Sequence, residues 1–253
     1  LVVNGPYRLV QWSTNNFIHL ERNESFYANE DVCIDEIFYY PTIDSVAAGR
    51  RVLNNEIDLN NEFAGQHIDR LRQEAPDYVR VSPYMGTVYY ALNLEDETFA
   101  DVRVRNALGM AIDRRFLADE IYRAGQEPAY SLVPPGVANY TNDARVRWAD
   151  EPIEAYRSSA DNPRIAPVVQ QDWESIADWV NVSITQIELQ IHYENLRAAD
   201  FQVGDGGWIA DFNDPYSFLY LGETQSIPMN YSRYRNPEYD ALDASGNREQ
   251  DME

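Results

Sequence analysis

The chain has 253 residues, of which 44% are hydrophobic and 13% aromatic, a composition typical of a folded protein with one large or two ordinary domains. Its net charge is −22, from 42 acidic and 20 basic residues. This acidic excess argues against nucleic acid or an anionic membrane as a partner. All basic residues are arginine, and the absence of lysine excludes a lysine Schiff base and a Walker-type phosphate loop. A single cysteine, Cys33, excludes an internal disulfide.

Hydrophobic periodicity and turn residues predict strands alternating with helices. A helix over residues 101–124, with Asp101 as its N-cap and Gly125 after its end, has the clearest apolar face. Alternation of this kind indicates the α/β class. The other predicted strands are 7–12, 17–21, 34–40, 56–60, 79–81, 88–94 and 182–187, and the other predicted helices are 45–53, 66–74, 168–179, 191–197 and 216–221.

The clearest candidate site is the stretch 206–221. Asp211 lies between Trp208 and Phe212, shortly after Gly206 and Gly207. The glycines let another backbone come close. The aromatic rings lower the local dielectric, so a carboxylate placed among them needs a cationic partner. These residues predict a pocket for the ammonium group of a ligand.

Asp214 has a different interpretation, because Pro215 follows it directly. Asp-Pro at the start of an apolar run predicts an N-cap with proline at the first position of a helix over 216–221. A glycosidase that pairs Asp211 or Asp214 with Glu188 is an alternative, although sequence does not set the distance between carboxylates.

Other kinds of chemistry have less support. The stretch after Asp211 lacks the glycine and the terminal glutamate of a calcium loop. His19, His67 and His192 are dispersed, so we predict neither a metal nor a cofactor. No Gly-x-Ser-x-Gly elbow exists to support Ser-His-Asp catalysis. None of these patterns gives positive support for an enzyme.

The sequence Trp-Ile-Ala-Asp-Phe-Asn-Asp-Pro-Tyr-Ser-Phe-Leu at 208–219 resembles the Trp-x-Ala-Asp-Tyr-x-[Asp/Glu]-Pro-x-x-Phe-Leu signature of bacterial extracellular oligopeptide-binding proteins. These proteins are the peptide-capturing subunits of ABC importers. Further blocks resemble the family in the same order, over nearly the whole chain: 4–9, 20–27, 56–58, 89–93, 99–114, 133–136 and 234–240.

The resemblance implies a two-lobed periplasmic-binding-protein fold of class II. Residues 1–85 would belong to the first lobe and 86–253 to the second, with a hinge near 84–87. The family has a longer helix, a Gly-Tyr turn and a strand around 154–162, and a returning strand after the last residues. We therefore expect a chain that is incomplete at both ends, with an internally shortened and C-terminally truncated second lobe, as in a fragment or a joining of discontinuous pieces.

The resemblance also implies a function: capture of short peptides in a cleft between the lobes and delivery to the permease subunits of an ABC transporter in the membrane. The expected location is the periplasm, or the outer face of a Gram-positive cell membrane. We expect a monomer that needs no cofactor and binds no nucleic acid.

By the same analogy, Asp211 would bind the α-ammonium group of the peptide. Strand-like hydrogen bonds would come from the backbone of Gly207 and Ile209. Strand alternation lets one of two neighbouring tyrosines face a cleft, and the family indicates Tyr89, which with Trp208 would wall the side-chain pockets. The remaining predicted ligand contacts are Gly86, Thr87, Asn61, Glu62, Asp205 and Phe212.

One position departs from the family. Well-known members place an arginine a few residues before the tryptophan, where it can meet ligand carboxylates, and here Asp205 stands in that place. Because Glu62 is also acidic, a cationic peptide or another cationic small solute becomes an alternative ligand. Relatives with this scaffold bind several kinds of solute, and the fold does not decide among them.

Overall fold

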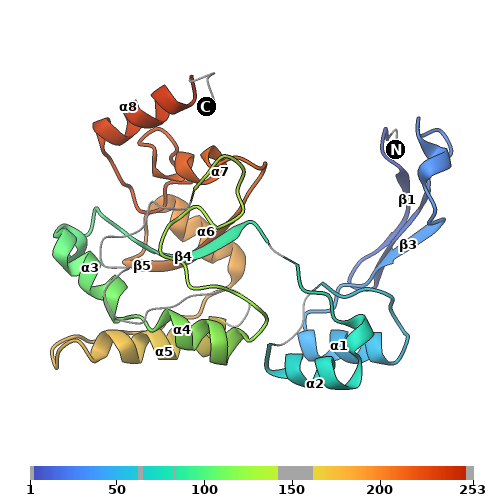
Figure 1. Cartoon of the computed structure of the whole chain (residues 1–253), viewed down its shortest axis with the longest axis horizontal. Coiled ribbons are helices and arrows are strands. Elements are labelled where there is room, and N and C mark those ends of the chain that lie inside the picture. The colour runs from blue at the N-terminus through green and yellow to red at the C-terminus, as the bar shows by residue number, and fades with distance from the viewer. Residues whose placement is uncertain (1–2, 62–64, 83, 142–161, 249–253) are drawn as a thin grey trace. The chain divides into compact units, whose positions relative to one another are not determined.

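The computed structural model describes residues 3–61, 65–82, 84–141 and 162–248 (Figure 1). They belong to two compact units, Leu1–Ala64 and Gly65–Glu253. Within the described residues, no helix has both the length and the apolar character needed to cross a membrane.

The first unit is a three-stranded antiparallel sheet followed by a helix. The sheet has the order β1 (Tyr7–Ser13), β2 (Phe17–Arg22) and β3 (Glu36–Tyr39), and a short 3-10 turn, Asn29–Asp31, lies between β2 and β3. Helix α1 spans Ser45–Leu53. It begins at its predicted residue because the carboxylate of Asp44 accepts the N–H groups of Val46 and Ala47 at 2.8 and 3.0 Å.

The second unit contains a two-stranded antiparallel sheet of β4 (Gly86–Leu92) and β5 (Val203–Ile209) with helices around it. Short 3-10 turns cover Gly65–His67, Pro76–Tyr78, Glu97–Phe99 and Tyr220–Gly222, and a π-helical turn covers Leu117–Tyr122. The α-helices are α2 (Ile68–Glu74), α3 (Val102–Ala111), α4 (Arg114–Phe116), α5 (Asn162–Glu174), α6 (Leu189–Ala198), α7 (Tyr216–Leu219) and α8 (Pro237–Gly246).

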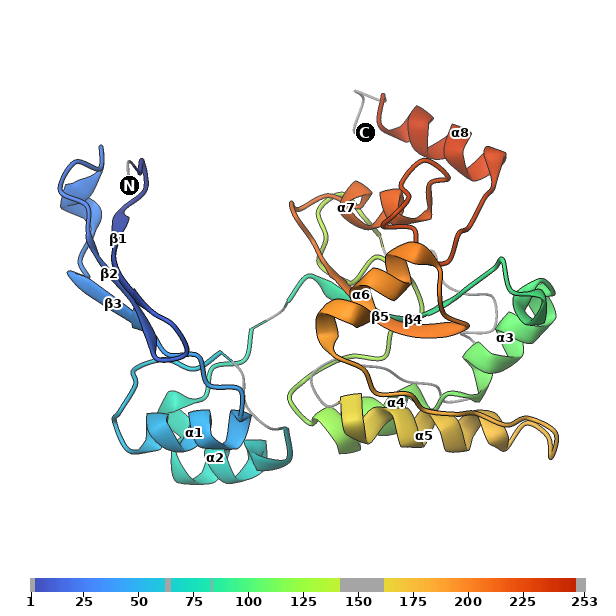
Figure 2. The ribbon, with the colours of Figure 1, turned by 180° about the vertical axis from the view of Figure 1, so that it is seen from behind.

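Both faces of the β4–β5 sheet are covered (Figure 2). Ala91 packs with Leu196 of α6 in one core cluster, and Tyr89 joins this cluster. On the other face, the ring of Tyr90 lies 5.5 Å from that of Trp173 in α5. Both rings are therefore partly buried within the second unit, and the expectation that Tyr89 walls a ligand pocket stays a prediction.

Several predicted elements differ from the structure. The helix predicted over 101–124 breaks after Ala111, because Asp113 caps the next turn by accepting the N–H of Phe116 at 3.0 Å. The strands predicted at 56–60, 79–81 and 182–187 are irregular. Segment 182–187 has the alternating pattern of a strand, but no described strand lies beside it to supply backbone hydrogen bonds.

The boundary between the two units, at 64/65, lies earlier in the sequence than the predicted boundary at 85/86. Gly65 is buried against the backbone of Tyr122, and Asp69 in α2 forms an ion pair with Arg123. Residues 65–85 are thus grouped with the second unit by their contacts. Their assignment to the first lobe of the family's fold stays a prediction.

Two carboxyl groups lie close together where α8 meets the loop that follows α7. Burial, together with a hydrogen bond to the buried Glu223 carboxylate, raises the pKa of Asp243 to about 6. Because the unfolded-state value is about 3.9, the folded chain binds more protons between the two values. We expect the wild-type protein to lose stability as the pH rises from about 4 to about 6, relative to Asp243→Asn. Urea midpoints of the two proteins across this range test the expectation, and parallel pH curves would contradict it.

Candidate functional site

The outer edge of β5 offers unused backbone groups. In an antiparallel pair, only every second residue bonds to the neighbouring strand. The N–H of Ala210 donates to the carbonyl of Met85 at 2.8 Å, which sets the alternation. Gly207 and Ile209 therefore direct their N–H and C=O groups away from β4, and no described residue bonds to them. This edge can accept another extended chain.

The same edge is closed at Asp205. Nε2 of His192, from α6, lies 2.8 Å from the Asp205 carbonyl oxygen and 3.4 Å from its carboxylate. Proximity to two oxygens indicates that Nε2 carries a proton and donates it. The carboxylate predicted to contact the ligand is thus held beside a histidine.

Asp211 lies just beyond the end of β5, in a turn that is fixed from within. Its N–H donates to Oγ of the fully buried Ser217 at 2.8 Å, and its carboxylate faces solvent. Burial and, to a smaller extent, this carboxylate raise the pKa of the Tyr220 hydroxyl. The Tyr220 ring in turn meets Trp208 edge to face at 5.6 Å. One carboxylate and two aromatic rings therefore gather around the turn.

The next two side chains of the turn are structural. Oδ1 of Asn213 accepts the N–H of Ala138 at 2.8 Å, which joins the loop containing Ala138 to the site. Oδ1 of Asp214 accepts the N–H of Tyr216 at 2.8 Å and so caps α7, as predicted. Glu188 caps α6 in the same way, so two of the three carboxylates considered for a glycosidase serve helix starts.

The sequence suggested that Gly206 makes room for a ligand backbone, but the structure gives this glycine a different role. A Cβ atom at this position would lie 3.1 Å from the ring of Tyr89, so the glycine accommodates that ring. Burial also raises the pKa of the Tyr89 hydroxyl. At Gly207, by contrast, a Cβ would make only ordinary contacts. Of the two glycines, only Gly207 lies on the open edge.

The structure brings most of the predicted residues to one end of the sheet. Thr87 is buried opposite Trp208, whereas the side chains of Ile209 and Phe212 are 55% and 51% exposed. Trp208 packs beside the cluster of Val133, Val137 and Phe218. Gly86 pairs with Ile209, while Tyr89 and Asp205 lie further along the strands. Asn61 belongs to the first unit, and Glu62 lies outside the described residues.

Sequence reasoning missed three supporting residues: Ser217, Tyr220 and His192. The spacing of Tyr216 and Tyr220 on one face of a capped helix could have indicated the tyrosine. The roles of Ser217 and His192 depend on contacts that are made only in the folded chain.

The fold is shared with two-lobed periplasmic binding proteins. The structure matches the murein tripeptide-binding protein MppA of Escherichia coli with a TM-score of 0.87 and 26% identity, over 98% of this chain and 53% of that one. It matches OppA of Burkholderia pseudomallei with a TM-score of 0.86 and 26% identity, over 98% and 54%. The predicted fold class is confirmed.

The sequence identifies the family. Residues 1–228 match the bacterial extracellular solute-binding proteins, family 5, middle region. The periplasmic oligopeptide-binding protein OppA of Salmonella typhimurium is 32% identical over 96% of this chain and 49% of its own length. The chain therefore belongs to the family 5 bacterial extracellular solute-binding proteins. It spans about half the length of the curated relatives that it matches.

Proposed function

We propose that the chain is the ligand-binding part of a solute-binding protein that captures short peptides for an ABC importer. One observation carries this proposal: the outward-facing backbone groups of Gly207 and Ile209 lie just ahead of the exposed carboxylate of Asp211. An extended peptide can bond to the first two and place its ammonium group at the third. Strand addition of this kind recognises the main chain whatever the side chains are.

The surrounding residues suit a ligand of variable sequence. Trp208, Tyr220 and the exposed Phe212 offer aromatic surface beside the edge, and water can fill the space that a small side chain leaves. Closure at a hinge near 84–87 would bury the peptide and signal the loaded state to the permease. In this mechanism the protein acts as a periplasmic monomer without a cofactor, and the peptide leaves unchanged.

The family supports binding rather than turnover, since its members are solute-binding proteins. Relatives are named for oligopeptides and for murein peptides. Within this chain, the carboxylates of Asp214 and Glu188 accept backbone N–H groups at the starts of two helices, and these structural roles favour the same conclusion.

A cationic small solute is the second candidate. Asp205 stands where well-known members have an arginine, and Asp211 adds a second carboxylate near this edge, so the local charge favours a ligand with more than one amine. A competition experiment tests this candidate. Displacement of a bound neutral peptide by a polyamine at an equal or lower concentration than the peptide would favour the cationic solute.

Short peptides are expected to raise the melting temperature in a saturable manner, whereas nucleotides and NAD leave it unchanged. At about 100 times the dissociation constant, a ligand that binds only the folded state adds roughly 2.7 kcal/mol of stability. Differential scanning fluorimetry with a broad library of tri- to pentapeptides measures this shift. Absence of any shift across the library would contradict the peptide proposal.

A further inference from the structure

The sheet has a second edge, on β4. The alternation that turns Gly207 outward on β5 also turns Val88 and Leu92 of β4 away from β5, because residues that face each other in the register share the same bonding state. No described residue is hydrogen bonded to their backbone groups. An exposed strand edge of this kind is a template for another extended chain.

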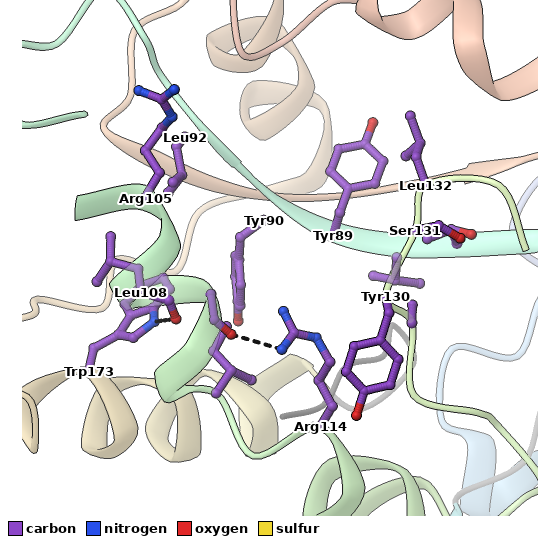
Figure 3. Close-up of a pocket in the computed structure, with 15 residues that line it drawn as sticks. Tyr89, Tyr90, Leu92, Arg105, Leu108, Arg114, Tyr130, Ser131, Leu132 and Trp173 are labelled. Carbon is purple, nitrogen blue, oxygen red and sulfur yellow. Dashed lines mark hydrogen bonds between the residues drawn. The ribbon is translucent and has the colours of Figure 1, made fainter. Parts of the chain in front are cut away.

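A pocket of about 310 Å³ runs along this edge (Figure 3). A pocket over one face of a strand would contact every second residue. This one is lined by residues 87–90 in succession, and by Leu92, so it follows the edge itself. Residues 129–132 form a further part of its wall, and α3 and α5 contribute Leu108, Ile112 and Trp173. The volume lies at the lower end of the range for ligand pockets.

The lining is apolar and positively charged. Among the described residues that line it, Arg105 and Arg114 are charged and none is acidic, in a chain whose net charge is −22. The guanidinium group of Arg114 donates to the carbonyl of Gly109 at 2.8 Å and lies 5.7 Å from the centre of the Tyr130 ring. Figure 3 shows this group between Tyr90 and Tyr130. Its charge and planar geometry suit a carboxylate.

We propose that the β4 edge is a second peptide-binding site, which takes an extended apolar segment with a C-terminal carboxylate. The segment pairs with the backbone of Val88 and Leu92, places an apolar side chain against Leu108 and Trp173, and brings its carboxylate to Arg114. This site is independent of the peptide-capture site on β5, because it uses the opposite edge of the sheet and the opposite end of a peptide.

The probe is an N-acetylated hexapeptide of alternating threonine and valine with a free C-terminal carboxylate. Acetylation removes the ammonium group that the β5 site would require, so the two sites are tested separately. Hydrogen exchange of the Val88 and Leu92 amides is expected to slow at least tenfold at saturating peptide, while exchange at Gly207 and Ile209 stays unchanged. N-methylation of every second residue removes the N–H groups that strand pairing needs and is expected to abolish this protection.

Arg114→Gln is expected to weaken binding of the hexapeptide about tenfold or more. A C-terminal amide on the hexapeptide is expected to have the same effect, because each change removes a charge-assisted hydrogen bond. Arg115→Gln is the matched control, since Arg115 is the next residue of α4, is exposed and does not line the pocket. Melting temperatures of both variants show whether they fold.

Three outcomes would overturn the proposal. The first is a lack of protection at Val88 and Leu92 in the wild-type protein, and the second is equal binding of the N-methylated peptide. The third is slow hydrogen exchange of these amides without peptide, in a dimer that forms as the protein concentration rises. That result would assign the edge to a second copy of the chain. A peptide with a free amine and an amidated C-terminus tests the β5 site separately. If it slows hydrogen exchange of the Gly207 and Ile209 amides, the β5 site binds peptide whatever the result at β4.

Discussion

Asp211→Asn is expected to weaken peptide binding by a factor of several hundred while leaving folding nearly intact. The carboxylate faces solvent, and no described residue bonds to it, so its loss removes no contact of the folded chain. In a closed and partly dry site, however, the ligand's ammonium group would be left without its partner. Breaking such a pair costs about 3–5 kcal/mol. Titration calorimetry gives the affinity, and a melting curve gives the stability.

Asp214→Asn is the matched control, because it removes the same charge three residues away. Asparagine keeps an oxygen that can accept the N–H of Tyr216, so both the cap and the ligand affinity should change little. N-acetylated peptides should bind the wild-type β5 site about as weakly as free peptides bind Asp211→Asn, because acetylation removes the ammonium charge. Equal losses from the two substitutions, or undiminished binding of acetylated peptide at Gly207 and Ile209, would assign the ammonium to another group.

Gly65→Ala is expected to lower the free energy of unfolding by about 1–3 kcal/mol or more. A Cβ atom at this position would lie 2.1 Å from the carbonyl oxygen of Tyr122, and a backbone carbonyl cannot rotate away as a side chain can. Residues 65–74 would have to move off the π-helical turn, which breaks their attachment to the second unit. Urea unfolding followed by tryptophan fluorescence measures the loss.

The same substitution at Gly49 is the control, because a Cβ there meets nothing within 4 Å. Gly49 lies inside α1, where alanine is favoured over glycine by roughly 0.5–1 kcal/mol, so Gly49→Ala should be neutral or stabilising. An unchanged urea midpoint for Gly65→Ala would mean that residues 65–74 do not pack against Tyr122 in solution.

The elements that the sequence predicted well are those with local signals. Helix α1 begins after Asp44 and ends at Leu53 as expected, because its cap lies within its own sequence. Strands β1 and β2 lie close to their predicted positions and pair with each other. Strand β5 has no such pattern, since three of its seven residues are glycine, and it exists because β4 supplies its hydrogen bonds. Segment 182–187 has the pattern, but no strand in the described part of the chain lies beside it.

The features of the candidate site also fall into those set by the local sequence and those set by contacts in the folded chain. The cap at Asp214 and the exposed carboxylate of Asp211 follow from neighbours in the sequence. The position of Tyr89 could not be predicted, because α6 covers one face of the sheet and α5 the other, and no local feature indicates that both faces are occupied. Ser217 holds the backbone of Asp211 from six residues away, a contact that exists only once α7 has formed.

The hydrogen bond between His192 and the carbonyl of Asp205 limits how many residues a ligand can align on β5. Among the described residues between Asp205 and the end of β5, Gly207 and Ile209 have outward-facing backbone groups, and these two positions span roughly 7 Å of strand. A peptide anchored by its amine at Asp211 would run antiparallel to β5 and use up this ladder within its first three or four residues. Under the proposed function, this edge would align only the first residues of a peptide, and the remainder of a longer peptide would have no backbone hydrogen bonds to β5.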